Sequence, residues 1–291
     1  MPNSKKFSFG AHEISIKKQN SKNIFFIKPL YNIVMVKIVF LDFDQTLYSH
    51  YSKRIPASAV KALNILHDKG IKIFLSTGRS LCELDNFDIS MIHIDGIIAN
   101  NGQIACDMDG NIVFDYPLSG ELKDILVKKF KKKTVPMFFN TKDDIFANYI
   151  NDAVIRTQND INTPIPNVKE YENEDIYMCS AFYDNEKDWD DLLSLKHLAN
   201  ITYWHDGAVD IVPNSISKAK GVELLINKLN IKQEETMCFG DGDNDSDMLE
   251  FCNIGVAMGN ATEKIKKVAD YVTNHIEEDG IYNALKQYNV I

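Results

Sequence analysis

Two carboxylates lie close together near the start of the first regular segment. Asp42 and Asp44 belong to the motif Asp-Phe-Asp-Gln-Thr, which follows an apolar stretch directly. Residues two apart on an extended backbone point to the same side, so these carboxylates would repel each other and the pKa of one would rise. A divalent cation would remove that conflict. The pair therefore suggests a cation site, and the alternative is an ordinary acidic loop.

Two further segments could bind a phosphate group. Ser76-Thr77-Gly78-Arg79 offers hydroxyl groups and backbone N–H donors at the turn after a second apolar stretch. Such a turn can bind a phosphate oxygen, although Thr-Gly is also common in plain turns. Lys218 precedes a helical pattern and could reach a phosphate or pair with a carboxylate. A lone lysine at a helix start is more often simply solvated.

The last group is Gly240-Asp241-Gly242-Asp243-Asn244-Asp245, again directly after an apolar stretch. Glycine permits a tight turn, and carboxylates with an amide suit coordination of a hard cation by oxygen. A calcium-binding loop or a plain turn are the alternatives. An EF-hand would need a glutamate twelve positions along, where this chain has Cys252.

The segments around these motifs predict an α/β fold with a Rossmann-like parallel sheet. Residues 36–41 are an almost continuous apolar run, typical of a strand buried on both faces. A helix is expected from Pro56 to a C-terminal stop at Gly70. Alternation of strands and helices indicates βαβ units. The further expected elements are strands 71–75, 96–99, 237–239, 254–258 and 271–273, and helices 222–229 and 262–268. Ligands of open α/β sheets bind beyond the carboxyl ends of such strands.

The middle of the chain, residues 118–212, has a different texture and is expected to form an inserted α+β domain. Its expected strands are 137–140, 145–149, 176–183 and 201–204, and its expected helices 121–133 and 185–195. The rest of the α/β domain would then comprise residues 35–117 and 213–291. Residues 1–34 carry six lysines and one acid, Glu13. They are either a basic extension or the result of a start assigned too early, with Met35 as the true beginning.

The composition limits the classes of partner. The formal net charge is -9, which argues against nucleic acid because its phosphates need a basic face. The five cysteines show no CxxC spacing and indicate a reducing compartment without a disulfide frame or zinc site. No apolar run approaches the length of a membrane span.

We expect a cytoplasmic protein, a monomer or dimer, with a small phosphorylated metabolite as its partner and no membrane partner.

Taken together, the four motifs occur in one order, each at a strand end or a helix start. From about Met35 to Ile291 the chain closely resembles the haloacid dehalogenase superfamily, and within it the Cof-type phosphatases of subclass IIB, which carry a large inserted cap. DxDxT, STGR, a following lysine and GDGxND are highly specific in combination. The resemblance implies an Mg²⁺-dependent phosphatase that hydrolyses small phosphorylated metabolites, with sugar phosphates expected, through an aspartyl-phosphate.

The same resemblance implies roles for the acidic residues. Asp42 corresponds to the nucleophile and Asp44 to the general acid and base. Mg²⁺ would be held by Asp42, the Asp44 carbonyl and Asp241. Asp245 would be a further ligand, either directly or through water.

The phosphate-binding roles are implied in the same way. Phe43, Thr77, Gly78, Lys218 and Asn244 correspond to the phosphate-binding positions. Lys220 is the weaker alternative to Lys218. Asn101, in Asn100-Asn101-Gly102 at the next strand end, is either a substrate contact or only part of a turn.

Two features of this chain stand apart from the motif match. Most relatives have glycine at the position of Gln45, and Gln would be strained if that position needed a positive φ. The cap would select the substrate, but its aromatic residues Tyr149, Tyr177, Phe182 and Trp204 are expected to belong to the core of the cap rather than to contact the substrate. Two other functions stay open: a phosphomutase of the same superfamily, and a non-enzymatic module that binds a phosphorylated metabolite.

Overall fold

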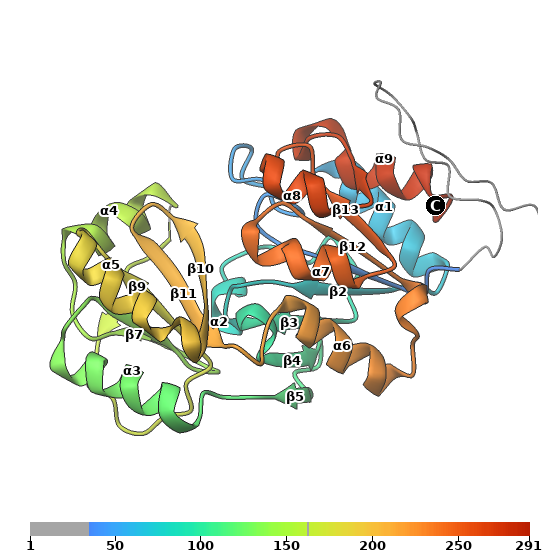
Figure 1. Ribbon diagram of the computed structural model, residues 1–291. Coiled ribbons are helices and arrows are strands. Elements are labelled where there is room, and N and C mark those ends of the chain that lie inside the picture. Colours follow the sequence, from blue (N-terminus) through green and yellow to red (C-terminus); the bar gives the residue numbers. More distant parts are fainter. Residues whose placement is uncertain (1–34, 162) are drawn as a thin grey trace, which may run out of the picture. The chain divides into compact units, whose positions relative to one another are not determined.

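The computed structural model describes residues 35–161 and 163–291, and these form two β-sheets with their helices (Figure 1). The prediction for residues 1–34 lies outside the described residues. Within the described part of the chain, no helix is long and apolar enough to cross a membrane.

The first sheet has eight strands in the order β14-β13-β12-β1-β2-β3-β4-β5. Neighbouring strands from β14 to β3 pair in parallel, and β4 and β5 are added antiparallel. The strands are β1 (Ile38–Leu41), β2 (Lys72–Ser76), β3 (Gly96–Ala99), β4 (Ile104–Asp107), β5 (Ile112–Asp115), β12 (Thr236–Gly240), β13 (Ile254–Ala257) and β14 (Tyr271–Val272). The parallel Rossmann-like sheet predicted from the sequence is confirmed.

Strand β1 is buried on both faces, as its continuous apolar run predicts. Val39 and Leu41 belong to one core cluster, and Ile38 and Phe40 belong to the other. Successive side chains of a strand point to opposite faces, so the two clusters lie on opposite sides of the sheet. A strand in this position has no face on which a polar side chain could be solvated. Its first polar residue therefore comes where the strand ends, at Asp42.

Helices cover the two faces of this sheet. Helices α1 (Ala57–Asp68) and α9 (Gly280–Gln287) pack into the cluster that contains Val39. Helices α6 (Lys218–Leu229), α7 (Ser246–Phe251) and α8 (Glu263–Val268) pack into the cluster that contains Phe40. The short helix α2 (Leu81–Leu84) follows β2. Gly70 ends α1 with φ +72°, as its predicted position after the helix requires.

The second sheet has six strands in the order β10-β11-β9-β6-β7-β8, all antiparallel except for the β7–β8 pair. Its elements are β6 (Met137–Asn140), β7 (Ile145–Ala147), β8 (Asn167–Val168), β9 (Met178–Phe182), β10 (Ala199–His205), β11 (Ala208–Pro213), α3 (Gly120–Lys132), α4 (Asp152–Asp160) and α5 (Glu186–Leu193). All of them fall between the two halves of the first sheet in the sequence. We refer to residues 118–212 as the inserted segment.

The two faces of the second sheet have different neighbours. Helices α3 and α5 lie side by side on one face (Figure 1), where Leu126 and Leu192 pack with Phe139. The opposite face carries Phe138 and Phe182, which pack with Val154 of α4. Ser180 and Asp210 are directly paired across β9 and β11, and Ser180 is also paired with Phe138. Directly paired residues share a face, so Ser180 and Asp210 lie on the face opposite α3 and α5.

Several elements were not predicted from the sequence: β4, β5, β8, β11, α2, α4, α7 and α9. Helix α4 is short and is capped by the side chain of Asn151, which accepts a hydrogen bond from Val154 N. Two of its buried residues, Thr157 and Gln158, are polar, so the helix lacks a clear apolar pattern in the sequence. Tyr177 is buried in a core, as expected, but the assignment to the cap is wrong: it packs with the first sheet and donates a hydrogen bond to Asp115. Phe182 is buried in the inserted segment as expected.

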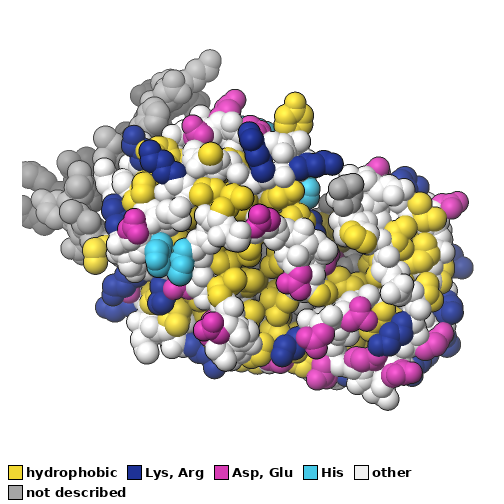
Figure 2. Space-filling model, turned by 180° about the vertical axis from the view of Figure 1, so that it is seen from behind, with side chains coloured by type: hydrophobic (Ala, Val, Ile, Leu, Met, Phe, Trp, Pro, Cys, Tyr) yellow, Lys and Arg dark blue, Asp and Glu magenta, His cyan; other side chains and the backbone are white. Residues whose placement is uncertain are grey.

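The molecular surface in Figure 2 carries acidic and basic side chains in close alternation, with apolar side chains between them. That view contains no continuous basic strip among the residues it colours.

Candidate active site

The polar motifs meet at one edge of the first sheet. Leu41 at the end of β1 is in register with Leu75 of β2 and with Phe239 of β12. The residues that follow these three strands are therefore neighbours, although they are far apart in the sequence. They include Asp42 and Asp241, which belong to two of the predicted motifs.

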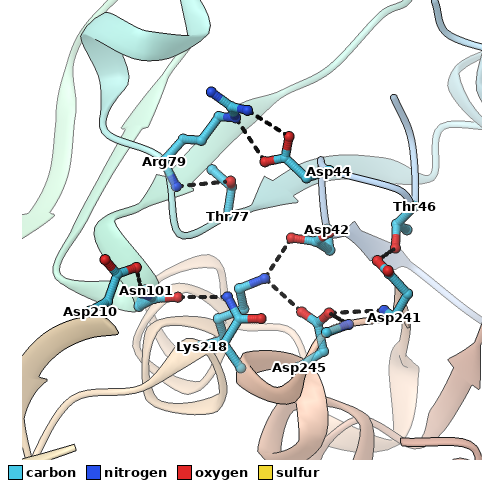
Figure 3. A network of polar contacts seen from close by, with 12 residues as sticks. Asp42, Asp44, Thr46, Thr77, Arg79, Asn101, Asp210, Lys218, Asp241 and Asp245 are labelled. Carbon is cyan, nitrogen blue, oxygen red and sulfur yellow. Dashed lines mark hydrogen bonds and ion pairs between the residues drawn. The ribbon is translucent and has the colours of Figure 1, made fainter. Parts of the chain in front are cut away.

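Lys218 joins two of the carboxylates (Figure 3). Its Nζ donates to Asp42 Oδ1 and to Asp245 Oδ1, each at 2.6 Å. The side chain of Lys218 is fully buried, at 0% exposure. Burial alone would lower the pKa of Lys218, but the charges of Asp245 and Asp42 outweigh it and raise that pKa. A permanently charged ammonium group is thus fixed beside the predicted nucleophile.

Asp245 is the anchor of the Gly-Asp-rich loop. Its Oδ2 accepts hydrogen bonds from the backbone N–H groups of Asp241 and Gly242, both at 2.9 Å. A Cβ atom at Gly240 would lie 2.5 Å from the side chain of Asp245, so no larger residue fits there without displacing the anchor. The close approach of the Asp245 side chain therefore explains why residue 240 is a glycine.

Three carboxylates form an acidic cluster. One oxygen each of Asp42, Asp241 and Asp245 lies within 4.8 Å of the others, the only such group among the residues that the structure describes. Thr46 Oγ1 donates to Asp241 Oδ1 at 2.8 Å. Burial and the charge of Asp245 raise the pKa of Asp241 to about 7. Burial likewise raises the pKa of Asp42, against the pull of Lys218.

The acidic cluster fits a magnesium ion. Three carboxylates face one ammonium group there, so the cluster carries more negative than positive charge. Oxygen ligands from carboxylates are the set that Mg²⁺ prefers, and a dication would allow Asp42 and Asp241 to stay ionised at neutral pH. Asp245 already accepts three hydrogen bonds, which favours contact through water for this residue.

Asp44 points away from the acidic cluster (Figure 3). Arg79 donates to both of its oxygens, from Nε at 2.7 Å and from Nη2 at 2.8 Å, and His50 Nε2 lies 2.7 Å from Oδ1. Burial would raise the pKa of Asp44, but the hydrogen bonds from His50 and Arg79 outweigh it and lower that pKa to about 2. Asp44 is therefore ionised, the form that accepts a proton.

Arg79 binds both oxygens of Asp44 through two hydrogen bonds, a bidentate contact that lysine could not form. The Arg79 guanidinium also packs 4.7 Å from the ring centre of Phe87, which fixes its orientation. If Asp44 transfers the proton, as the sequence predicts, we expect Arg79→Lys to lower kcat about 10-fold with little change in KM, because the Asp44 carboxylate loses its fixed direction. Steady-state kinetics would test this, with Arg156→Lys as the matched control at an exposed pair with Asp184. A wild-type kcat for Arg79→Lys would contradict this role.

Two predicted ligand-binding side chains, Asn101 and Asn244, lie close to Gly78. A Cβ atom there would lie 3.2 Å from Asn101 Oδ1 and 3.4 Å from Asn244 Nδ2. Asn244 Nδ2 donates to Asn101 Oδ1 at 2.9 Å. Thr77 is buried, and its hydroxyl oxygen accepts from Arg79 N. The side chain of Phe43 is buried and stacks on Tyr48, so only the Phe43 backbone is suited to contact phosphate.

Gln45 occupies a left-handed backbone conformation, with φ +58°. This is the positive φ at which a glutamine is expected to be strained. The conformation is held by neighbouring contacts: Gln45 N donates to Tyr48 O, and Asn260 donates to Gln45 O, both at 2.8 Å. Non-glycine residues in this region cost about 1 kcal/mol or more, so the turn after Asp44 is strained.

The structure also separates the two candidate lysines. Lys218 contacts Asp42, whereas Lys220 pairs with Glu223 at 2.7 Å and is half exposed. Sequence reasoning missed His50, Arg79 and Asp210. Arg79 stands inside the quoted Ser-Thr-Gly-Arg motif, so its presence near the site could have been inferred, but its pairing with Asp44, 35 positions away, could not. His50 and Asp210 had no such signal.

Comparisons with known proteins agree with this geometry. The family model of the haloacid dehalogenase-like hydrolases matches residues 39–285. YkrA of Bacillus subtilis (strain 168) is 30% identical over 258 residues, which cover 88% of this chain and 98% of YkrA.

Two solved structures are similar over nearly the whole described chain. BT1666 from Bacteroides thetaiotaomicron, described among the phosphatases of this superfamily, is 31% identical with a TM-score of 0.81, covering 89% of this chain and 97% of that one. The subclass IIB sugar phosphatase BT4131 is 34% identical with a TM-score of 0.77, covering 88% and 100%. The chain therefore belongs to the haloacid dehalogenase-like hydrolases and is an enzyme of their Cof-type phosphatases.

Proposed function

We propose that this enzyme is a magnesium-dependent phosphomonoesterase that acts on small phosphorylated metabolites, with sugar phosphates as the preferred class. The observation that carries the proposal is the buried Lys218, which holds Asp42 at 2.6 Å beside the acidic cluster. The similarity to BT4131, which is named as a sugar phosphatase, supports the substrate class.

In the first half-reaction, a carboxylate oxygen of Asp42 attacks the phosphorus atom, and the bond from phosphorus to the leaving oxygen breaks. Lys218 and the amide of Asn244 are placed to stabilise the charge of the transferring group. Asp44 gives a proton to the leaving oxygen. Because Asp44 is ionised while it is held by Arg79 and His50, it takes up that proton from solvent as it leaves these partners and turns toward the substrate.

In the second half-reaction, water attacks the phosphorus atom of the aspartyl-phosphate. The ionised Asp44 takes a proton from this water, and phosphate and the free Asp42 carboxylate are formed. Mg²⁺ would be held by the side chains of Asp42 and Asp241 and by the Asp44 carbonyl, with Asp245 contributing through water. When bound there, it would neutralise the phosphate charge and hold the phosphate in line for attack.

The proposal predicts phosphate release that depends on magnesium. We expect purified protein to release phosphate from a panel of sugar phosphates, nucleotides and p-nitrophenyl phosphate. EDTA should reduce that rate to background because the acidic cluster cannot hold the phosphate without a dication, and added Mg²⁺ should restore it. The sugar product should appear in the same amount as phosphate. An undiminished rate in EDTA, or no release from any substrate by folded protein, would overturn the proposal.

A further inference from the structure

A second buried carboxylate, Asp210, lies beyond the acidic cluster. It belongs to β11 in the inserted segment and is 9% exposed. Its Oδ1 accepts a hydrogen bond from Ser180 Oγ at 2.8 Å, and its Oδ2 accepts one from Asn101 Nδ2 at 3.3 Å. Among the described residues, no lysine, arginine or histidine forms an ion pair with it, unlike Asp42 and Asp44. A buried, unpaired carboxylate is unfavourable for folding, which calls for a functional explanation.

Asp210 is connected to the phosphate-binding residues by a short chain of contacts. Asn101 donates to Asp210 (Figure 3) and accepts from Asn244. A Cβ atom at Gly78 would touch both amides. Asp210 is thus one side chain away from the place where the phosphate is expected. A substrate whose phosphate lies at Gly78 and Asn244 would direct its leaving group past Asn101 toward Asp210.

The groups around Asp210 are hydrogen-bonding groups without a positive charge. Its hydrogen-bond partners are a hydroxyl and an amide, and the nearby indole of Trp204 lowers the pKa of the same carboxylate. The Trp204 Nε1 atom is buried and has no hydrogen-bond partner in the described part of the chain. Burial raises the pKa of Asp210 to about 7, although Ser180 and Asn101 pull it down. Such a surface can both accept hydrogen bonds from hydroxyl groups and donate to them.

We propose that Asp210, with Ser180, Asn101 and Trp204, forms the subsite that selects the leaving group, and that it selects a neutral, polyhydroxylated one. The carboxylate oxygens accept hydrogen bonds from the hydroxyls of a sugar or polyol. A leaving group with its own carboxylate or a second phosphate is repelled. The inference rests on the proposed phosphatase function and narrows its substrate class.

The first test compares substrates that share a phosphate but differ in the leaving group. One substrate is glucose 6-phosphate, whose leaving group is rich in hydroxyl groups. The other is p-nitrophenyl phosphate, whose leaving group carries no further hydroxyl group. We expect Asp210→Asn to lower the ratio of their kcat/KM values by about 10- to 100-fold, the effect of losing a charged hydrogen bond. Ser180→Ala, which releases the carboxylate from its orientation, should lower the same ratio by about 3- to 10-fold.

The control is Asp184→Asn, the same substitution at an exposed carboxylate of the inserted segment, which should leave the ratio unchanged. With 2-phosphoglycolate, which has an anionic leaving group, Asp210→Asn should increase kcat/KM relative to p-nitrophenyl phosphate. An unchanged ratio in Asp210→Asn, or equal losses on all three substrates, would overturn the inference.

The second test is binding without turnover, which separates this inference from the proposed function. Titration calorimetry in the Asp42→Asn background would compare glucose 6-phosphate with inorganic phosphate, each with Mg²⁺. We expect the added Asp210→Asn change to weaken glucose 6-phosphate binding at least about 10-fold more than phosphate binding. If the wild type hydrolyses nothing but this difference is found, only the phosphatase proposal fails. Equal effects on both ligands would overturn the role of Asp210.

Discussion

Asp42→Asn is expected to reduce phosphate release by at least about a thousandfold, because the substitution removes the atom that forms the covalent intermediate. The variant should fold, since burial already favours the neutral form of this side chain and raises the pKa of Asp42. The measurement is kcat on the best substrate of the panel, with circular dichroism as the check on folding.

The matched control for this loss is Asp243→Asn. Asp243 belongs to the same acidic loop, but its side chain is exposed and pairs with Lys264. This control should keep kcat within about twofold, because exposed pairs contribute little. If Asp42→Asn retained a tenth of the wild-type rate, Asp42 could not be the nucleophile.

Lys218→Met is expected to impair both catalysis and folding. The change leaves Asp42 and Asp245 buried without their shared ammonium group, and losing one partner of a buried ion pair costs about 3–5 kcal/mol in the free energy of unfolding. The loss of a charge that stabilises the transferring phosphate should lower kcat about 100- to 1,000-fold. Denaturant unfolding and steady-state kinetics measure the two effects separately.

Lys220→Met provides the comparison two residues further along α6. Its half-exposed pair with Glu223 should be worth less than about 1 kcal/mol, and kcat should not change. Similar effects of the two substitutions would show that Lys218 has no special place in the site.

The parallel sheet could be predicted because each of its buried strands is marked by a local feature, a continuous run of apolar residues. Strand β1 is buried on both faces, so its apolar run is continuous and its end is marked by the first polar residue, Asp42. The same holds for β12 and the loop after it. Strand ends near the site could therefore be located from residue types alone.

The contacts of Asp44 and Asp210 could not be predicted in this way. Arg79 lies 35 positions from Asp44, and Asn101 lies 109 positions from Asp210. Nothing in the local pattern encodes such distant pairs, because they are set by strand order and by the path of the inserted segment. Strand β11 was itself missed, and with it the carboxylate that it carries. The division of the chain at residues 118 and 212 likewise stays a proposal.

The most direct test of the central claim is to trap the phosphorylated enzyme. Rapid acid quenching during turnover of a ³²P-labelled substrate should give protein-bound label that hydroxylamine removes, as expected for an acyl phosphate. Peptide mapping should place this label on the peptide that contains Asp42, and Asp42→Asn should carry none. Steady turnover by the wild type with no label on that peptide, or label that persists in Asp42→Asn, would contradict a covalent intermediate on Asp42.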